Sequence, residues 1–144
     1  MINFDMTNEE YHAHADVLSA SGTKTIAFDD LATFKYAERK ESAAFDVGTA
    51  THTLVLQPEL ADTIWMGAAD RRGLAWKKTK LEAEEAGALL LTEGDYLLAH
   101  DMAEAVRANK AAAELLSGDL VCEASVFAKH ERTGIDIRCR PDGW

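Results

Sequence analysis

Two side chains of this 144-residue chain suit a divalent metal and stand where metal chemistry is plausible. The first is Asp142. It follows residues 135–140, in which apolar and polar residues alternate as they do in a half-buried strand. Pro141 then ends the strand, so that a carboxylate is delivered at its end. Such a carboxylate can be an oxygen ligand for Mg²⁺, or it can simply begin a turn. Both interpretations stay open on this segment alone.

The second side chain is His52, which stands in the segment 45–56, closed by Pro58. Local propensity is divided there, because β-branched residues alternate partly as in a strand, whereas the length and the proline fit a helix. In a helix, Gly48 lies one turn before His52, and its missing side chain would let a backbone or a metal site approach the imidazole. The alternative is a core or interface histidine held by one hydrogen bond, and periodicity alone favours it.

Two further groups of polar residues are candidate binding sites for an anion such as phosphate. Ser19 or Ser21 caps the start of a helix, and its hydroxyl, the free N–H groups of the first turn and Lys24 would form a small anion site. Most serine caps are only caps, however. Five basic residues fall within residues 71–80. An ordinary solvated helix start is the simpler interpretation of that cluster, and a DNA-facing surface is the alternative.

Composition limits the classes of protein that fit. A chain of this length suits one domain, spanning 1–144, and 47% hydrophobic residues are enough for a real core. The net charge of −10 argues against a simple coating of nucleic acid, although an acidic nuclease can confine its basic residues to one channel. Two cysteines imply no disulfide framework. With no signal peptide or membrane-spanning run, a reduced, cytoplasmic protein is expected.

The elements that must position these residues predict an α+β fold, in which helices precede a C-terminal β-hairpin. The hairpin strands are expected at 121–128 and 135–141, with an unpaired edge beyond the second strand. In the helix expected at 96–108, Leu97, Leu98, Met102, Ala105 and Val106 are expected to form the buried stripe. Further elements are expected as helices near 7–12, 19–24, 29–40, 71–86 and 110–116. A short strand is expected at 62–66, and a short buried strand or a turn at 89–91.

Several of these segments, in this order, resemble one family: the exodeoxyribonuclease VIII (RecE)-like exonucleases of phages and prophages, within the PD-(D/E)XK superfamily. The most specific feature is the pairing of Gly48-Thr49-x-x-His52 with a strand that ends in Arg140-Pro141-Asp142 about ninety residues later. The resemblance extends over nearly the whole chain, and its other matching segments are 11–13, 18–24, 53–59, 72–77, 102–107, 113–116, 123–127 and 133–134.

The resemblance implies a metal-dependent exonuclease that digests linear duplex DNA from 5′ ends and leaves single strands for recombination. It implies a mixed sheet flanked by helices, with Mg²⁺ as the cofactor of the full-length family and Mn²⁺ as a substitute. In this chain alone, the binding of the metal is expected to be weak or absent. His52 and Asp142 become the catalytic and metal-binding residues. The implied partners are double-stranded DNA ends, further copies of the chain in a ring and a single-strand annealing protein, in the cytoplasm of a bacterial host.

The resemblance also assigns softer roles. Ser21 and Lys24 would approach the 5′-phosphate end of DNA, and Arg140 would line the DNA channel together with the basic cluster at 71–80. Glu123, on the strand before the motif, would be a secondary acid. A plain cross-strand partner for Arg138 or Arg140 is the alternative for Glu123.

One part of the family pattern is missing. The family's second acid and lysine, spaced as D/E-x-K on the following strand, match no residue, since only Gly143 and Trp144 follow Asp142. We therefore expect the N-terminal portion of a nuclease domain, truncated after the first motif and with negligible activity alone. One alternative is a non-catalytic module, derived from such a nuclease, that binds DNA ends or a partner. The other is an unrelated small α+β protein in which His52 and Asp142 are structural.

Overall fold

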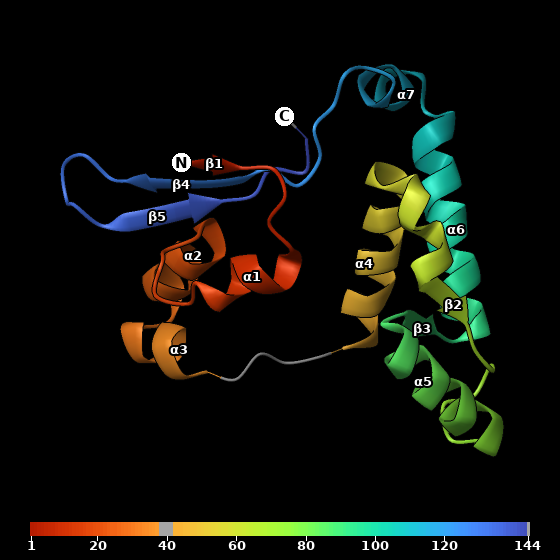
Figure 1. Cartoon of the computed structure of the whole chain (residues 1–144). Helices are drawn as coiled ribbons and strands as arrows, with labels where there is room; N and C mark the ends of the chain where they lie inside the picture. Colours follow the sequence, from red (N-terminus) through yellow and green to blue (C-terminus); the bar gives the residue numbers. More distant parts are fainter. Residues whose placement is uncertain (38–41, 144) are drawn as a thin grey trace. The chain divides into compact units, whose positions relative to one another are not determined.

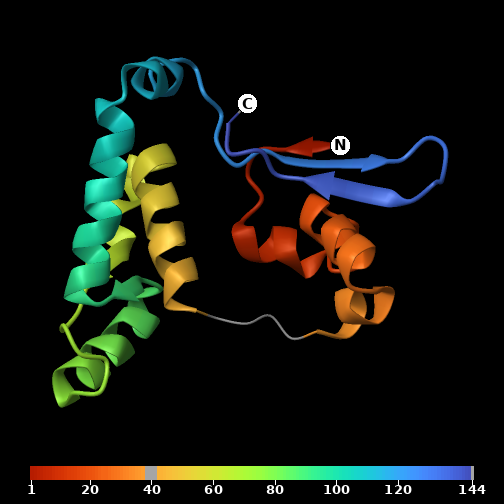
Figure 2. The ribbon, with the colours of Figure 1, turned by 180° about the vertical axis from the view of Figure 1, so that it is seen from behind.

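The computed structural model describes residues 1–37 and 42–143. These residues form two compact units, and each is described by itself (Figures 1 and 2). The first unit comprises both ends of the chain, Met1–Lys40 and Leu120–Trp144, and the second unit is the continuous segment Glu41–Asp119. The predicted α+β class is confirmed, and so is the C-terminal antiparallel hairpin.

A three-stranded antiparallel sheet forms the centre of the first unit, in the order β1 (Ile2–Asn3), β4 (Ser125–Lys129) and β5 (Asp136–Cys139). β4 begins later than the sequence predicts. Glu123 has a φ of 60°, which an extended strand cannot contain, so the regular strand starts only beyond it. β1 supplies the third strand that a stable hairpin needs.

The outer edge of β5 is not fully unpaired, so the expectation of a free edge is wrong there. Leu18 forms a parallel bridge with Ile137. The Leu18 N–H donates to the carbonyl of Asp136 at 3.0 Å, and the Arg138 N–H donates to the carbonyl of Leu18 at 2.9 Å. The exposed backbone groups of an edge strand need partners, and here a segment more than one hundred residues earlier in the chain provides two of them.

The same unit contains three short helices, each begun by a side-chain cap. Thr7 and Glu10 form a reciprocal capping box, and the hydrogen bond from the Thr7 backbone lowers the pKa of Glu10. Asp30 accepts from the Thr33 N–H at 2.6 Å, which likewise lowers the pKa of Asp30. Of the helix expected over 29–40, the structure has Leu31–Tyr36, and residues 38–40 lie outside the described residues. The three helices are α1 (Asn8–Ala13), α2 (Ala20–Phe28) and α3 (Leu31–Tyr36).

The second unit is mainly helical and contains one small parallel sheet (Figure 2). Its two strands are joined through a helix, in a β–α–β connection, and the sequence predicted the first as a strand and the second as a strand or a turn. The elements in chain order are α4 (Ala43–Leu56), the 3₁₀ helix η1 (Pro58–Thr63), β2 (Ile64–Met66), α5 (Leu74–Ala86), β3 (Leu89–Leu91), α6 (Glu93–Ala108) and α7 (Lys110–Leu116).

The segment of divided propensity is the helix α4. Ser42 begins it, because its hydroxyl accepts a hydrogen bond from the Phe45 N–H at 3.3 Å. Within the helix, the Thr51 hydroxyl donates to the carbonyl of Val47 at 2.9 Å, which satisfies a β-branched polar residue in the helical state. An apolar side that packs on α6 then outweighs the strand propensity of its threonines and valines.

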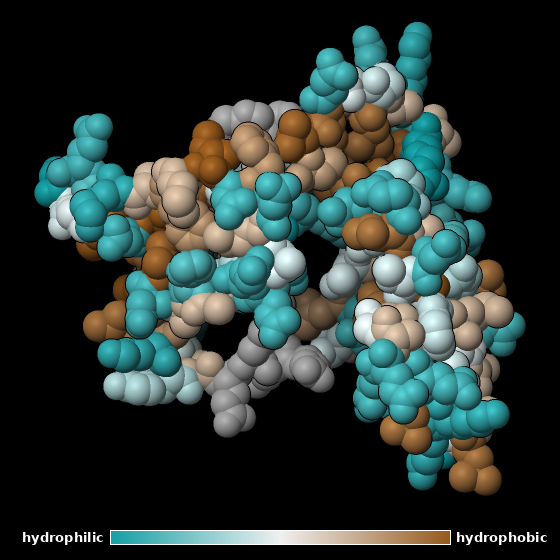
Figure 3. All heavy atoms as spheres, viewed as in Figure 1, coloured by the Kyte–Doolittle hydropathy of each residue, from teal (hydrophilic) through white to brown (hydrophobic). Residues whose placement is uncertain are grey.

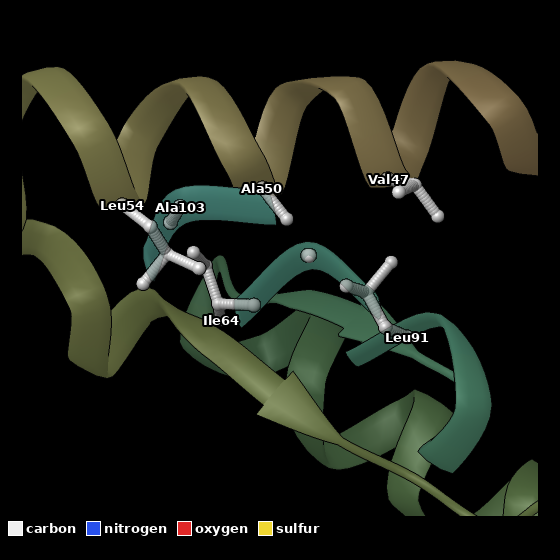
Figure 4. Packing of buried hydrophobic residues seen from close by; sticks show 7 residues of the cluster. Val47, Ala50, Leu54, Ile64, Leu91 and Ala103 are labelled. Atoms are coloured by element: carbon white, nitrogen blue, oxygen red, sulfur yellow. The ribbon is translucent and has the colours of Figure 1, made fainter. Parts of the chain in front are cut away.

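The core of the second unit lies between α4, the two strands and α6 (Figure 4). Ala50 of α4 faces the buried Ala99 and Ala103 of α6, and these small side chains let the two helices approach closely. The stripe predicted for α6 is therefore wrong in its large residues. Leu97, Leu98 and Met102 are 52%, 50% and 44% exposed, whereas the two alanines are fully buried.

Among the described residues, no helix combines the length and the apolar character that crossing a bilayer requires. Helix α5 is instead a mostly polar helix. Figure 3 shows hydrophilic and hydrophobic side chains side by side on its visible surface, and its Leu74 and Leu81 are 85% and 63% exposed.

Candidate functional site

Asp142 lies in the first unit, in the tail that follows β5. A carboxylate oxygen of Asp142 and one of Glu123 lie within 4.8 Å of each other. Two Mg–O bonds of about 2.1 Å span at most about 4.2 Å, so two oxygens within 4.8 Å of each other can both bind one divalent cation after a side-chain movement of a few tenths of an ångström. The structure thus brings the predicted metal ligand and the predicted secondary acid together.

The tail that carries Asp142 packs on a leucine. A β-carbon added to Gly143 would lie 2.6 Å from the Cδ1 atom of Leu120, so any side chain there would have to displace the leucine. Pro141 fixes its own φ just before Asp142 and offers no N–H to a neighbouring strand. Ring geometry and close packing therefore define the backbone on both sides of the Asp142 carboxylate.

Glu123 is held by Arg140. The Arg140 Nε atom lies 2.6 Å from Glu123 Oε2 and also donates to the Glu123 carbonyl oxygen at 3.1 Å. Both side chains are largely buried, with 12% and 18% of their surfaces exposed. A charge-assisted bond in such a setting is stronger than one in water. The ion pair between Glu123 and Arg140, one of the two predicted roles of Glu123, is confirmed, although both residues lie just outside the regular strands β4 and β5.

Tyr11 is the residue on which the arginines of β5 and its tail rest, and the sequence analysis missed this role. The guanidinium carbon of Arg138 lies 4.5 Å from the centre of the Tyr11 ring, and that of Arg140 lies 5.5 Å from it. The Arg138 guanidinium also donates to the Tyr11 carbonyl. Burial raises the pKa of Tyr11. A signal was available, since Tyr11 is the one large aromatic residue in the capped helix α1.

Two of these arginine nitrogens have unusual surroundings. Arg138 Nε and Arg140 Nη1 are buried and have no hydrogen-bond partner among the described residues. Both guanidinium groups lie within cation–π range of Tyr11, which compensates part of their desolvation. The remaining Nη2 of Arg140 donates to the carbonyl of Met6 at 2.9 Å. The Nε and Nη2 donors of Arg140 are both bonded to groups of the first unit. The predicted contact of Arg140 with DNA stays a prediction.

The serine-rich start of α2 also lies in the first unit. Ser19, not Ser21, is the cap, because its hydroxyl accepts from the Gly22 N–H at 3.1 Å. The hydroxyls of Ser19 and Ser21 are 3.0 Å apart and hydrogen-bonded to each other. Lys24 is exposed one turn further on. The contact of Ser21 and Lys24 with DNA stays a prediction.

His52 belongs to the second unit and lies in α4, one turn after Gly48. Among the described residues, a β-carbon added to Gly48 would meet no atom within 4 Å, so the helix has open space at that position. The helical interpretation of this motif is confirmed. The pairing of His52 with Asp142 joins the two units and stays a prediction.

The basic cluster at 71–80 forms ion pairs within the second unit. Arg71 lies 3.2 Å from Asp95 and 3.7 Å from Asp46, and its guanidinium stacks over Trp76 at 5.3 Å. Two lysines of α5 pair with glutamates one turn on, at 3.9 Å for Lys78–Glu82 and 3.5 Å for Lys80–Glu84. Such pairs are typical of a solvated helix, and a DNA-facing role for the cluster stays a prediction.

No protein-family model, curated protein or solved structure matches this chain. The functional argument therefore depends on the two sequence motifs and on the geometry of the residues that carry them.

Proposed function

We propose that this chain provides part of the metal site of a DNA exonuclease of the exodeoxyribonuclease VIII-like kind. Asp142 is the first metal ligand, Glu123 is a secondary acid beside it, and His52 of the second unit is a further ligand. The observation that carries the proposal is the pair of carboxylate oxygens, within 4.8 Å of each other, formed where β5 runs into Pro141 and Asp142.

The residue types fit the chemistry of phosphodiester hydrolysis. A divalent cation in this site would activate a water molecule and neutralise charge on the phosphate. Asp142 and Glu123 offer the hard oxygen ligands that Mg²⁺ and Mn²⁺ prefer. A neutral His52 imidazole would either bind the cation or orient a ligand of it.

Cleavage of DNA requires further residues besides Asp142, Glu123 and His52. The resemblance also requires a second acid and a lysine in a D/E-x-K strand, where the lysine orients the water or stabilises developing charge. Of the 144 residues, only Gly143 and Trp144 follow Asp142, and neither side chain can take those roles. For a polypeptide of these residues alone, we predict metal binding without digestion of DNA.

The first experiment is a Mn²⁺ titration followed by the electron paramagnetic resonance of free Mn²⁺. We expect one site that is lost in Asp142→Asn. Asp136→Asn is the matched control, because Asp136 is an acid of the same unit that pairs with Lys129 at 2.8 Å and is 61% exposed. A Mn²⁺ site that survives Asp142→Asn unchanged would contradict the proposal.

A second experiment tests the prediction of no cleavage. Linear duplex DNA incubated with the 144-residue polypeptide and Mg²⁺ should remain intact. Mg²⁺-dependent digestion that Asp142→Ala abolishes would show that the site is complete without the D/E-x-K strand. Binding of linear but not circular duplex DNA, without any Asp142-dependent metal site, would favour the non-catalytic module that binds DNA ends.

The place of His52 is tested by nuclear magnetic resonance. Substoichiometric Mn²⁺ broadens the signals of nuclei near it, so we expect the His52 imidazole signals to broaden in the wild type and not in Asp142→Asn. His100, which stacks near Tyr96 in α6 of the same unit, provides the internal comparison. Sharp His52 signals at a Mn²⁺ concentration that fills the Asp142 site would remove His52 from the proposal.

A further inference from the structure

We propose that Arg140 is a positioning residue for this metal site. It fixes the Glu123 carboxylate beside that of Asp142, and it does so without itself binding the cation. This inference rests on the proposed function, because it concerns the same two carboxylates.

Arg140 contacts both the side chain and the backbone of Glu123. Its Nε atom lies 2.6 Å from the Glu123 carboxylate and 3.1 Å from the carbonyl oxygen of the same residue. Its Nη2 atom donates to the Met6 carbonyl at 2.9 Å, which anchors the guanidinium to the N-terminal segment. A planar guanidinium with several fixed donors can make these three contacts at once, whereas a lysine ammonium on a flexible stem cannot reproduce that geometry.

Glu123 needs these bonds, because its backbone is in a conformation that residues other than glycine rarely adopt. Its φ of 60° is left-handed, and among the described residues it is the only one other than glycine with a positive φ. Left to its own preference, a glutamate there would relax toward an extended conformation and carry its carboxylate elsewhere. The bonds from Arg140 to both the carboxylate and the carbonyl of Glu123 oppose that relaxation.

Arg140 is itself immobilised. Its side chain is 12% exposed and lies against Tyr11, whose ring also carries the guanidinium of Arg138. Restricted access of water strengthens the ion pair with Glu123. The Tyr11 ring therefore holds Arg140 in place, and Arg140 in turn holds the Glu123 carboxylate beside that of Asp142.

Removal of Arg140 should change the affinity for a cation in opposite directions, depending on whether Arg140 positions Glu123 or acts only through its charge. Arg140 is a positive charge paired with Glu123, whose carboxylate lies within 4.8 Å of that of Asp142, so electrostatics alone predicts that its removal strengthens the binding of a cation. If Arg140 instead holds Glu123 in place, its removal weakens binding, as loss of residues that orient metal ligands usually does.

The test is the Mn²⁺ titration of Arg140→Met and Arg140→Lys, with Arg138→Met as the matched control. Arg138 is the same residue type, two positions earlier, and rests on the same ring. We expect Arg140→Met to weaken Mn²⁺ binding by about 10- to 100-fold and Arg140→Lys to fall between it and the wild type. Arg138→Met should leave binding unchanged or slightly tighter, and circular dichroism should confirm that each variant is folded.

Each outcome decides the matter. Equal or tighter binding in Arg140→Met overturns the inference, as does equal weakening in Arg138→Met, which would indicate a general loss of structure. If Arg140→Met does not fold, Arg140→Lys carries the test, and wild-type affinity in that variant overturns it. A wild type without an Asp142-dependent Mn²⁺ site refutes the proposed function itself, whereas an intact site that is indifferent to Arg140 refutes only the positioning role.

Discussion

Replacement of Leu91 by alanine should destabilise the second unit severely. Leu91 is fully buried in β3 and belongs to the core cluster that also contains Val47, Ala50, Ile64 and Ala99. The change removes the buried leucine side chain beyond its β-carbon and leaves a cavity. The alanines of this cluster cannot change rotamer to fill that space, and the β-branched Val47 and Ile64 have few rotamers, so little of the cavity will collapse. Burial loss and cavity together cost about 3–5 kcal/mol at such a site.

That cost is large compared with the stability of the unit. A unit of about 80 residues has a free energy of unfolding of roughly 4–12 kcal/mol. The assay is urea unfolding followed by tryptophan fluorescence, since Trp65 and Trp76 both belong to this unit. Leu74→Ala is the control. Leu74 is 85% exposed, so its loss should change the free energy of unfolding by at most about 0.5 kcal/mol.

A cost of less than about 1 kcal/mol for Leu91→Ala would refute the packing argument. It would mean either that the cavity fills by movement of α6 toward α4 or that Leu91 does not belong to the core. A comparable loss in Leu74→Ala would refute it differently, because the effect would then not depend on burial.

The remaining predictions concern a helix cap and a buried phenol. Thr92→Ala removes the hydroxyl that accepts from the Asp95 N–H at 3.2 Å at the start of α6, and urea unfolding should show a loss of about 1 kcal/mol. Burial raises the pKa of Tyr11 above its ordinary value of 10.0, so the unfolded chain ionises first as pH rises. The stabilising contribution of Tyr11 is therefore complete below pH 10.0 and is lost as pH rises through the folded pKa. Phenolate absorbance should show a late ionisation step that Tyr11→Phe removes, and an unchanged titration curve in that variant would contradict the assignment.

Local chemistry made part of the fold predictable. Thr7 with Glu10, and Thr92 ahead of a periodic apolar run, are caps whose partners lie within one helical turn, so the sequence alone identifies them. The hairpin follows from alternation around a glycine-containing turn. The strand at Ile2–Asn3 was not predictable, because a two-residue strand has no periodicity and forms only by pairing with a distant partner.

The errors have a common cause in contacts that are distant in sequence. Hydrophobicity predicted that Met102 would be buried in α6, but the approach of α4 favours small alanines at that surface. Leu18 covers part of the β5 edge from far away in the chain. At the site, strand alternation predicted that Asp142 follows the end of a strand and that an arginine pairs with Glu123. Neither the left-handed backbone of Glu123 nor the support from Tyr11 leaves a mark in the local pattern.

The division of the chain into a continuous and a discontinuous unit has a consequence for biosynthesis. Residues 41–119 emerge from the ribosome as one uninterrupted stretch and can fold as soon as they are synthesised. The first unit cannot, because the amino group of Met1 bonds to the carbonyl of Phe127, across a sequence separation of 126. Its N-terminal helices must wait until β4 and β5 have been synthesised. We therefore expect the first unit to fold last and more slowly, and its α1 and α2 segments to be the part of the nascent chain most open to proteases and chaperones.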